Sequence, residues 1–99
     1  MKVDVFFSLF SSPSKAYGSV TGTLDIDEPF ELGKRVRVLQ SAPDDWFDGV
    51  MDIEILTEVP VHHRPLVGLG AIVAQSEEDA ARLGRRFETE AGLFSDPYD

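Results

Sequence analysis

The residues with the most obvious capacity for chemistry lie in the stretch PDDWFDGVMD, residues 43–52, which holds the only tryptophan among four aspartates. An EF-hand calcium loop starting at Asp44 would need an acidic or amide side chain at its third position and a glutamate at its twelfth. The chain has Trp46 and Ile55 at those positions. These mismatches exclude a calcium loop of this type.

The same stretch is typical of a turn between two strands, because proline, aspartate and an Asp-Gly pair favour turn conformations. In such a turn the two aromatic residues lie either at the tip or folded beneath it, and large aromatic side chains are usually buried. An exposed aromatic pair ringed by acid would instead suit the docking of a basic protein. The candidate partner-binding residues are Asp44, Asp45, Trp46, Phe47 and Asp48.

The only histidines, His62 and His63, are adjacent in sequence. In an extended segment neighbouring side chains point to opposite faces, so this pair is a poor ligand set for one metal ion. An exposed loop is the simpler interpretation. No spacing connects a histidine to a serine or carboxylate in a catalytic arrangement. The sequence therefore predicts no catalytic residues and no cofactor, and it favours binding over catalysis.

Two other patterns give still weaker evidence for a functional site. Gly68 and Gly70 fit part of a dinucleotide-binding loop, but Val73 stands where glycine or alanine is required. Close packing of strands explains these glycines better. Four carboxylates also lie close together in sequence, and a solvated turn accounts for them better than a hydrolytic pair does. They are Asp25, Asp27, Glu28 and Glu31.

The formal net charge of −9 is concentrated in residues 41–63, which hold six acidic residues and no lysine or arginine. Nucleic-acid binding is disfavoured, because phosphate contacts depend on lysine and arginine. A basic protein partner is allowed, although excess acid also serves solubility alone. The chain has no cysteine, which excludes disulfides and thiol catalysis.

The amino-terminal run is too short for a signal peptide and is interrupted by Asp4. No apolar run approaches the length needed to cross a bilayer. We therefore expect a cytoplasmic protein without membrane association.

Hydrophobic periodicity of two predicts five strands, over residues 2–10, 19–27, 34–40, 49–58 and 66–74. In the first, Val3, Val5, Phe7 and Leu9 share one face. Residues 11–18 are expected to form a loop. In the fourth, Met51, Ile53 and Ile55 are expected to share a face.

A helix is predicted over residues 77–91, with Ser76 as the N-cap and Gly92 as the stop. Its narrow apolar stripe is rich in small residues, so it should lie close against a sheet. Leu93 and Phe94 are expected to pack back onto the fold, and residues 95–99 to form a frayed tail.

With 42% apolar residues in 99, the chain should form one domain, residues 1–99, around a core. Strands followed by a single helix predict an α+β fold: a five-stranded, mostly antiparallel sheet, or a small barrel, with one C-terminal helix. The stretch GTLDIDEPFELGKRVRVL, residues 22–39, resembles the strand–loop–strand unit in the β-barrel second domain of translation GTPases. That resemblance implies a barrel-like sheet and no functional residues.

The favoured hypothesis is a small acidic module that binds a basic protein and inhibits it, as a toxin-neutralising immunity protein does. The alternative is a domain that binds a small ligand or metal in a pocket between helix and sheet. An oligomer assembled through residues 65–74 is a further hypothesis. The oligomeric state stays open.

Overall fold

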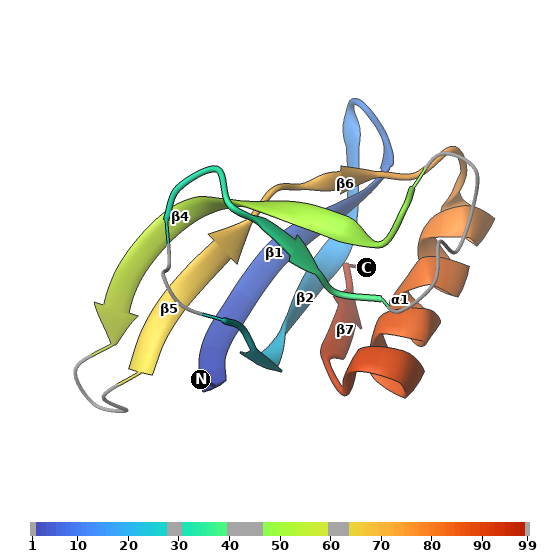
Figure 1. Ribbon diagram of the computed structural model, residues 1–99. Coiled ribbons are helices and arrows are strands. Elements are labelled where there is room, and N and C mark those ends of the chain that lie inside the picture. Colours follow the sequence, from blue (N-terminus) through green and yellow to red (C-terminus); the bar gives the residue numbers. More distant parts are fainter. Residues whose placement is uncertain (1, 28–30, 40–46, 60–63, 99) are drawn as a thin grey trace.

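A computed structural model describes residues 2–27, 31–39, 47–59 and 64–98, which Figure 1 shows as strands, one helix and their connections. The elements are β1 (Lys2–Ser12), β2 (Lys15–Asp25), β3 (Arg35–Arg37), β4 (Val50–Val59), β5 (Arg64–Leu69), β6 (Ile72–Val73), α1 (Glu77–Ala91) and β7 (Phe94–Pro97). The predicted α+β class with one helix is confirmed.

The sheet has seven strands and is open, so the predictions of five strands and of a barrel are wrong. Its order is β3-β4-β5-β1-β2-β7, and β6 also pairs with β1. Strand β1 is central: it is antiparallel to β2 and parallel to both β5 and β6. Within the described residues, β5 pairs on both edges inside the chain, with β1 and with β4.

Three local predictions need correction. Most of the predicted loop at residues 11–18 belongs to strands, because β1 and β2 extend to a tight turn at residues 13–14. The predicted strand at residues 66–74 is divided into β5 and β6. Residues 94–97 form strand β7 along β2, where a frayed tail was expected.

Strand β7 forms because the helix ends in a tight reversal. Gly92 takes a left-handed conformation (φ 69°), and its N–H donates to the Phe87 carbonyl. Leu93 is then buried, as predicted. Phe94 comes next and is 72% exposed, because adjacent residues of a strand point to opposite faces. Its expected packing against the fold is therefore wrong.

The core lies between the inner face of the sheet and the helix, which Figure 1 shows beside β7 at one end of the sheet. The predicted inner face of β1 is confirmed: Val3, Val5, Phe7 and Leu9 are buried. The Phe7 ring meets that of Phe87 edge to face, with centroids 5.0 Å apart.

The helix has the predicted bounds and N-cap, since Ser76 Oγ accepts the Asp79 N–H at 3.1 Å. A β-carbon on Gly84 would lie 2.6 Å from Ser95 Oγ. The helix therefore lies close against the sheet, as its small residues predicted.

A β-bulge changes the faces of β4. The pairing register with β5 shifts between Ile53 and Ile55, so that Ile55 lies opposite Gly68. Met51 and Ile53 are buried, whereas Ile55 is 49% exposed. The prediction that Ile55 shares their face is wrong, because a bulge inserts one extra residue and breaks the alternation. A β-carbon on Gly68 would lie 2.8 Å from Ile55 Cβ, which confirms close packing at this glycine.

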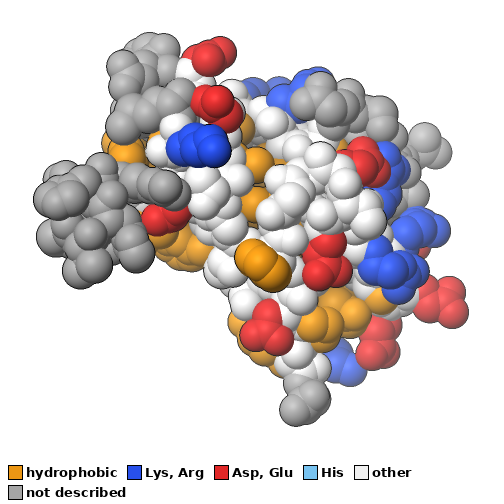
Figure 2. Space-filling view, turned by 90° about the horizontal axis from the view of Figure 1, so that it is seen from below, with side chains coloured by type: hydrophobic (Ala, Val, Ile, Leu, Met, Phe, Trp, Pro, Cys, Tyr) orange, Lys and Arg blue, Asp and Glu red, His pale blue; other side chains and the backbone are white. Residues whose placement is uncertain are grey.

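Large apolar side chains are exposed at several separate places in the described chain. Figure 2 shows one face, on which apolar side chains form patches divided by polar and backbone atoms. The exposed members are Leu32, Ile55, Leu56, Val73, Phe94 and Tyr98. No helix in the described ranges is long and apolar enough to span a membrane.

Candidate functional site: a pocket where the sheet divides

The sheet divides where β5 gives way to β6. Up to Leu69 the strand pairs with β4, and the Gly70 N–H still donates to the Asp52 carbonyl at 3.0 Å. Beyond that point β6 follows β1, with Ile72 opposite Leu9. The first residues of β4 pair instead with β3, on the other side. A gap therefore opens between β4 and β6.

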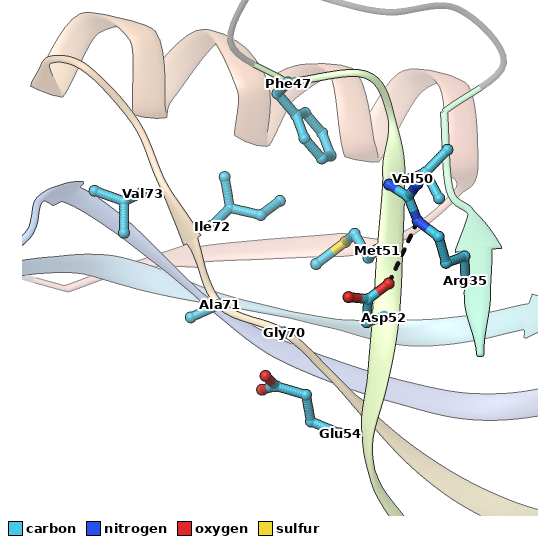
Figure 3. Close-up of a pocket in the computed structure, with 10 residues that line it drawn as sticks. All are labelled: Arg35, Phe47, Val50, Met51, Asp52, Glu54, Gly70, Ala71, Ile72 and Val73. Carbon is cyan, nitrogen blue, oxygen red and sulfur yellow. Dashed lines mark ion pairs between the residues drawn. The ribbon is translucent and has the colours of Figure 1, made fainter. Parts of the chain in front are cut away.

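A cavity of about 340 Å³ occupies this gap, which we call the split pocket (Figure 3). Its volume lies within the usual range of ligand pockets, roughly 300–1,000 Å³. The lining residues come from β3, from the start of β4 and from β6 with the segment before it. They are Arg35, Phe47, Val50, Met51, Asp52, Glu54, Gly70, Ala71, Ile72 and Val73.

The inner wall of the split pocket is apolar. Met51 and Ile72 are both buried in the core, and Phe47 is half-buried. The Phe47 ring is tilted by 55° against that of Phe87, with centroids 6.3 Å apart. Figure 3 shows these side chains of the pocket between the two diverging strands. The wall is therefore continuous with the hydrophobic core.

The outer rim of the split pocket is charged. Arg35 Nε lies 3.5 Å from Asp52 Oδ1, and Arg35 Nη2 lies 3.5 Å from Asp48 Oδ2. All three side chains are more than half exposed, so each ion pair contributes little to stability, about 0–1 kcal/mol. The pairs nevertheless place an arginine of β3 against acidic residues that have no basic neighbour in sequence.

Glu54 is the carboxylate of the split pocket that this arginine does not neutralise. A β-carbon on Gly70 would lie 3.5 Å from Glu54 Cδ and 3.6 Å from Oε1, so the carboxylate lies beside Gly70. Figure 3 shows it below the gap, apart from the Arg35–Asp52 pair. No ion pair joins Glu54 to any residue that the structure describes. One negative charge of the lining is therefore available to a ligand.

The turn chemistry predicted just before β4 is present in the described part of that stretch. Asp48 Oδ1 accepts the Val50 N–H at 3.1 Å, and Gly49 has a φ of 84°. An aspartate that accepts from the backbone two residues ahead, followed by a glycine with positive φ, is typical turn chemistry. Arg37 also donates to the Asp48 carbonyl, at 3.4 Å.

Several candidates named from the sequence lie outside the described residues: Asp44, Asp45, Trp46, Glu28, His62 and His63. Within the described ranges, no three His, Cys, Asp or Glu side chains come together as a metal site would require. The other members of the acidic group, Asp25, Asp27 and Glu31, are exposed.

A second cavity, of about 160 Å³, lies between the β1–β2 turn, the start of the helix and the end of β7. Its lining residues are Ser11, Lys15, Ala16, Tyr17, Glu77 and Tyr98. It is smaller than typical ligand pockets, and it places Lys15 and Glu77, of opposite charge, in one lining.

Sequence reasoning missed most of the split pocket. Its walls combine β3 and β6 with β4, which are far apart in sequence. One signal was present: Gly70 stands within the apolar run at the point where the chain separates from β4. Comparison of the chain with protein-family models, with curated proteins and with solved structures finds no match in any of the three.

Proposed function

We propose that this protein is a non-catalytic binding module whose split pocket receives a basic segment of a partner protein. The observation that carries the proposal is Glu54, an exposed carboxylate with no cation partner in the described chain, at the rim of a pocket with an apolar inner wall. A lysine or arginine side chain has both matching parts, an apolar stem and a charged head.

The charges of the lining favour a cation over an anion. The lining holds two carboxylates and one guanidinium, and that guanidinium is already paired with Asp52. An incoming ammonium near Glu54 would therefore meet one unbalanced negative charge. At an effective dielectric constant of about 20, two opposite charges 4 Å apart attract by about 4 kcal/mol before the cost of desolvation. The net gain is smaller, and it falls as salt screens the pair.

The partner-binding residues named from the sequence fit this proposal in different ways. Phe47 supplies part of the apolar wall. Asp48 adds negative charge beside Arg35, at the edge of the pocket. Asp44, Asp45 and Trp46 immediately precede Phe47 in sequence but lie outside the described residues, so their part in binding stays a prediction. Inhibition of the partner, as by an immunity-type protein, would follow if the bound segment belonged to its active site.

The direct test is an NMR titration of the ¹⁵N-labelled protein with acetyl-Lys-Val-Lys-Val-Lys-amide, in which lysines alternate with small apolar residues. We expect amide shifts at the residues that line the split pocket, and weaker binding when the salt concentration rises from about 20 mM to about 300 mM. The peptide acetyl-Glu-Val-Glu-Val-Glu-amide should produce no such shifts.

Glu54→Gln is the deciding variant, and Glu88→Gln on the exposed helix surface is its matched control. We expect Glu54→Gln to raise the dissociation constant about threefold, the effect of losing one exposed ion pair, and Glu88→Gln to leave it unchanged. Equal binding by the two variants, or shifts confined to another surface, would rule out the proposed site.

The other hypothesis from the sequence was a small ligand bound between helix and sheet. The smaller cavity at the start of the helix is the described feature that supports it, and a small ligand bound there would shift the amides of Tyr17 and Tyr98 in a titration of its own.

A further inference from the structure

Two open strand edges border the split pocket, one of β6 and one of β4. In a strand, the N–H and C=O of successive residues point alternately to its two sides. The Ala74 N–H donates to the Phe10 carbonyl of β1. The backbone groups of the preceding residue, Val73, therefore point away from β1 and toward the gap.

The edge of β4 faces the same gap. The Ile53 N–H donates to the Lys34 carbonyl, on the β3 side. The backbone N–H and C=O groups of Asp52 and Val50 consequently point to the side opposite β3. In agreement with this, the Asp52 carbonyl accepts the Gly70 N–H. The Val50 N–H is occupied by the Asp48 side chain. The Asp52 N–H and the Val50 carbonyl are left facing the pocket.

From these edges we infer that the partner enters the split pocket as a short extended segment, which hydrogen-bonds to the backbone of β6 at Val73 and of β4 at Asp52. This inference rests on the function proposed above and specifies how the basic segment is held. Addition of a strand to an open edge is a general mode of peptide recognition, in which main-chain hydrogen bonds supply affinity and alternate side chains supply specificity.

The surroundings of the gap define the residues that such a segment would carry. On the inner side the pocket is bounded by Phe47, Met51 and Ile72, so an inward side chain must be small and apolar. On the outer side Glu54 is available, so the next side chain must be basic. The edges diverge from the Gly70–Asp52 hydrogen bond, and the volume of about 340 Å³ suits a few residues better than a long strand.

The inference is tested by comparing acetyl-Lys-Val-Lys-Val-Lys-amide with the same peptide N-methylated at both valines. N-methylation removes the two valine N–H donors and keeps the charge. We expect the methylated peptide to bind about tenfold more weakly, since the loss of two hydrogen bonds multiplies two factors of roughly two- to tenfold in affinity. On the protein, hydrogen exchange of the Asp52 and Val73 amides should slow when the unmodified peptide binds.

Val73→Pro is the complementary change on the protein. It removes the N–H that faces the gap without removing a donor to β1. We expect it to weaken binding of the unmodified peptide about fivefold. The methylated peptide and the exchange measurement use the wild-type chain, so the test stands even if this variant fails to fold.

The two proposals fail differently. Equal binding of both peptides, together with weakened binding by Glu54→Gln, would overturn strand addition and leave side-chain recognition in the pocket. Absence of binding by the unmodified peptide at low salt would overturn the proposed function as well. Protection of the Asp52 and Val73 amides by the unmodified peptide alone supports both.

Discussion

The two ends of the sheet differ in how closely neighbouring atoms approach one another. At the end formed by β1, β2, β7 and α1, backbones and side chains approach so closely that glycine is required. A β-carbon on Gly18 would lie 2.5 Å from the Asp96 carbonyl oxygen, and one on Gly22 would lie 2.6 Å from Leu93 Cδ2. At the end formed by β3, β4 and β6, the nearest atoms to a β-carbon on Gly70 lie 3.5 Å away or more. A pocket takes the place of a strand pairing there.

This difference indicates which end of the sheet is stabilised by close contacts and which end is packed more loosely. Close packing of apolar groups stabilises the closed end, whereas the open end has exposed ion pairs that contribute little. Binding sites commonly occupy such less-packed regions, while rigid elements hold their walls in place. Phe47 joins the two ends, because its ring lines the pocket and contacts Phe87.

The largest expected contrast comes from truncating one core side chain at each end. Phe87 is fully buried, and Met51 is nearly so but borders the pocket. We expect Phe87→Ala to lower the free energy of unfolding by about 4 kcal/mol and Met51→Ala by about 2 kcal/mol. The cavity at Met51 joins space that already exists, so fewer contacts are lost. Denaturant unfolding measures both, and a loss for Met51→Ala as large as that for Phe87→Ala, despite the smaller side chain, would contradict a loosely packed open end.

A smaller contrast is expected from adding one methyl group at each end. Gly18→Ala forces the β-carbon into the backbone of β7, which should cost about 2 kcal/mol. Gly70→Ala meets only ordinary contacts and should change stability by less than about 0.5 kcal/mol. Thermal unfolding gives the comparison. A large loss for Gly70→Ala would contradict a loosely packed open end.

The smallest effect concerns pH. The Arg86 guanidinium donates to Glu90, and this hydrogen bond lowers the pKa of the Glu90 carboxyl. When the pKa of a carboxyl group is lower in the folded state than in the unfolded state, its charged form stabilises the fold at pH values above the unfolded-state pKa. This stabilisation is lost as the pH falls through the folded-state pKa. We expect wild type to lose slightly more stability than Glu90→Gln between about pH 6 and about pH 3. Identical pH profiles of unfolding would show that the pair contributes nothing.

Local patterns predicted the elements whose structure depends on near neighbours in sequence. The helix, its Ser76 cap and its Gly92 stop follow from such rules, because each depends on residues within about two turns. The inner face of β1 follows from alternation alone. Prediction failed at Ile55, where a bulge reverses the face, and at Phe94, where the chain after the helix forms an edge strand. Both depend on the partner strand.

The features of the candidate site likewise fall into those that local patterns predicted and those that depend on partner strands. Sequence identified an acidic region around residues 41–63 and the turn at Asp48-Gly49, since composition and turn preference are local properties. It could not place Arg35 of β3 against Asp48 and Asp52, because the antiparallel register of β3 with β4 brings them together. Nor could it identify Glu54 as the carboxylate of the split pocket left without a partner in the described chain.

By itself, then, the sequence determined the fold class, the helix, the alternation of the central strand and the excess of acid. The tertiary structure decided that the chain separates from β4 at Gly70 while both β5 and β6 pair with β1, and that β7 completes the sheet. It also decided that a pocket opens between β4 and β6. The physical reason is that periodicity and capping act within a few residues. Strand order, register and the gap between two edges depend instead on contacts between distant segments, which no local pattern records.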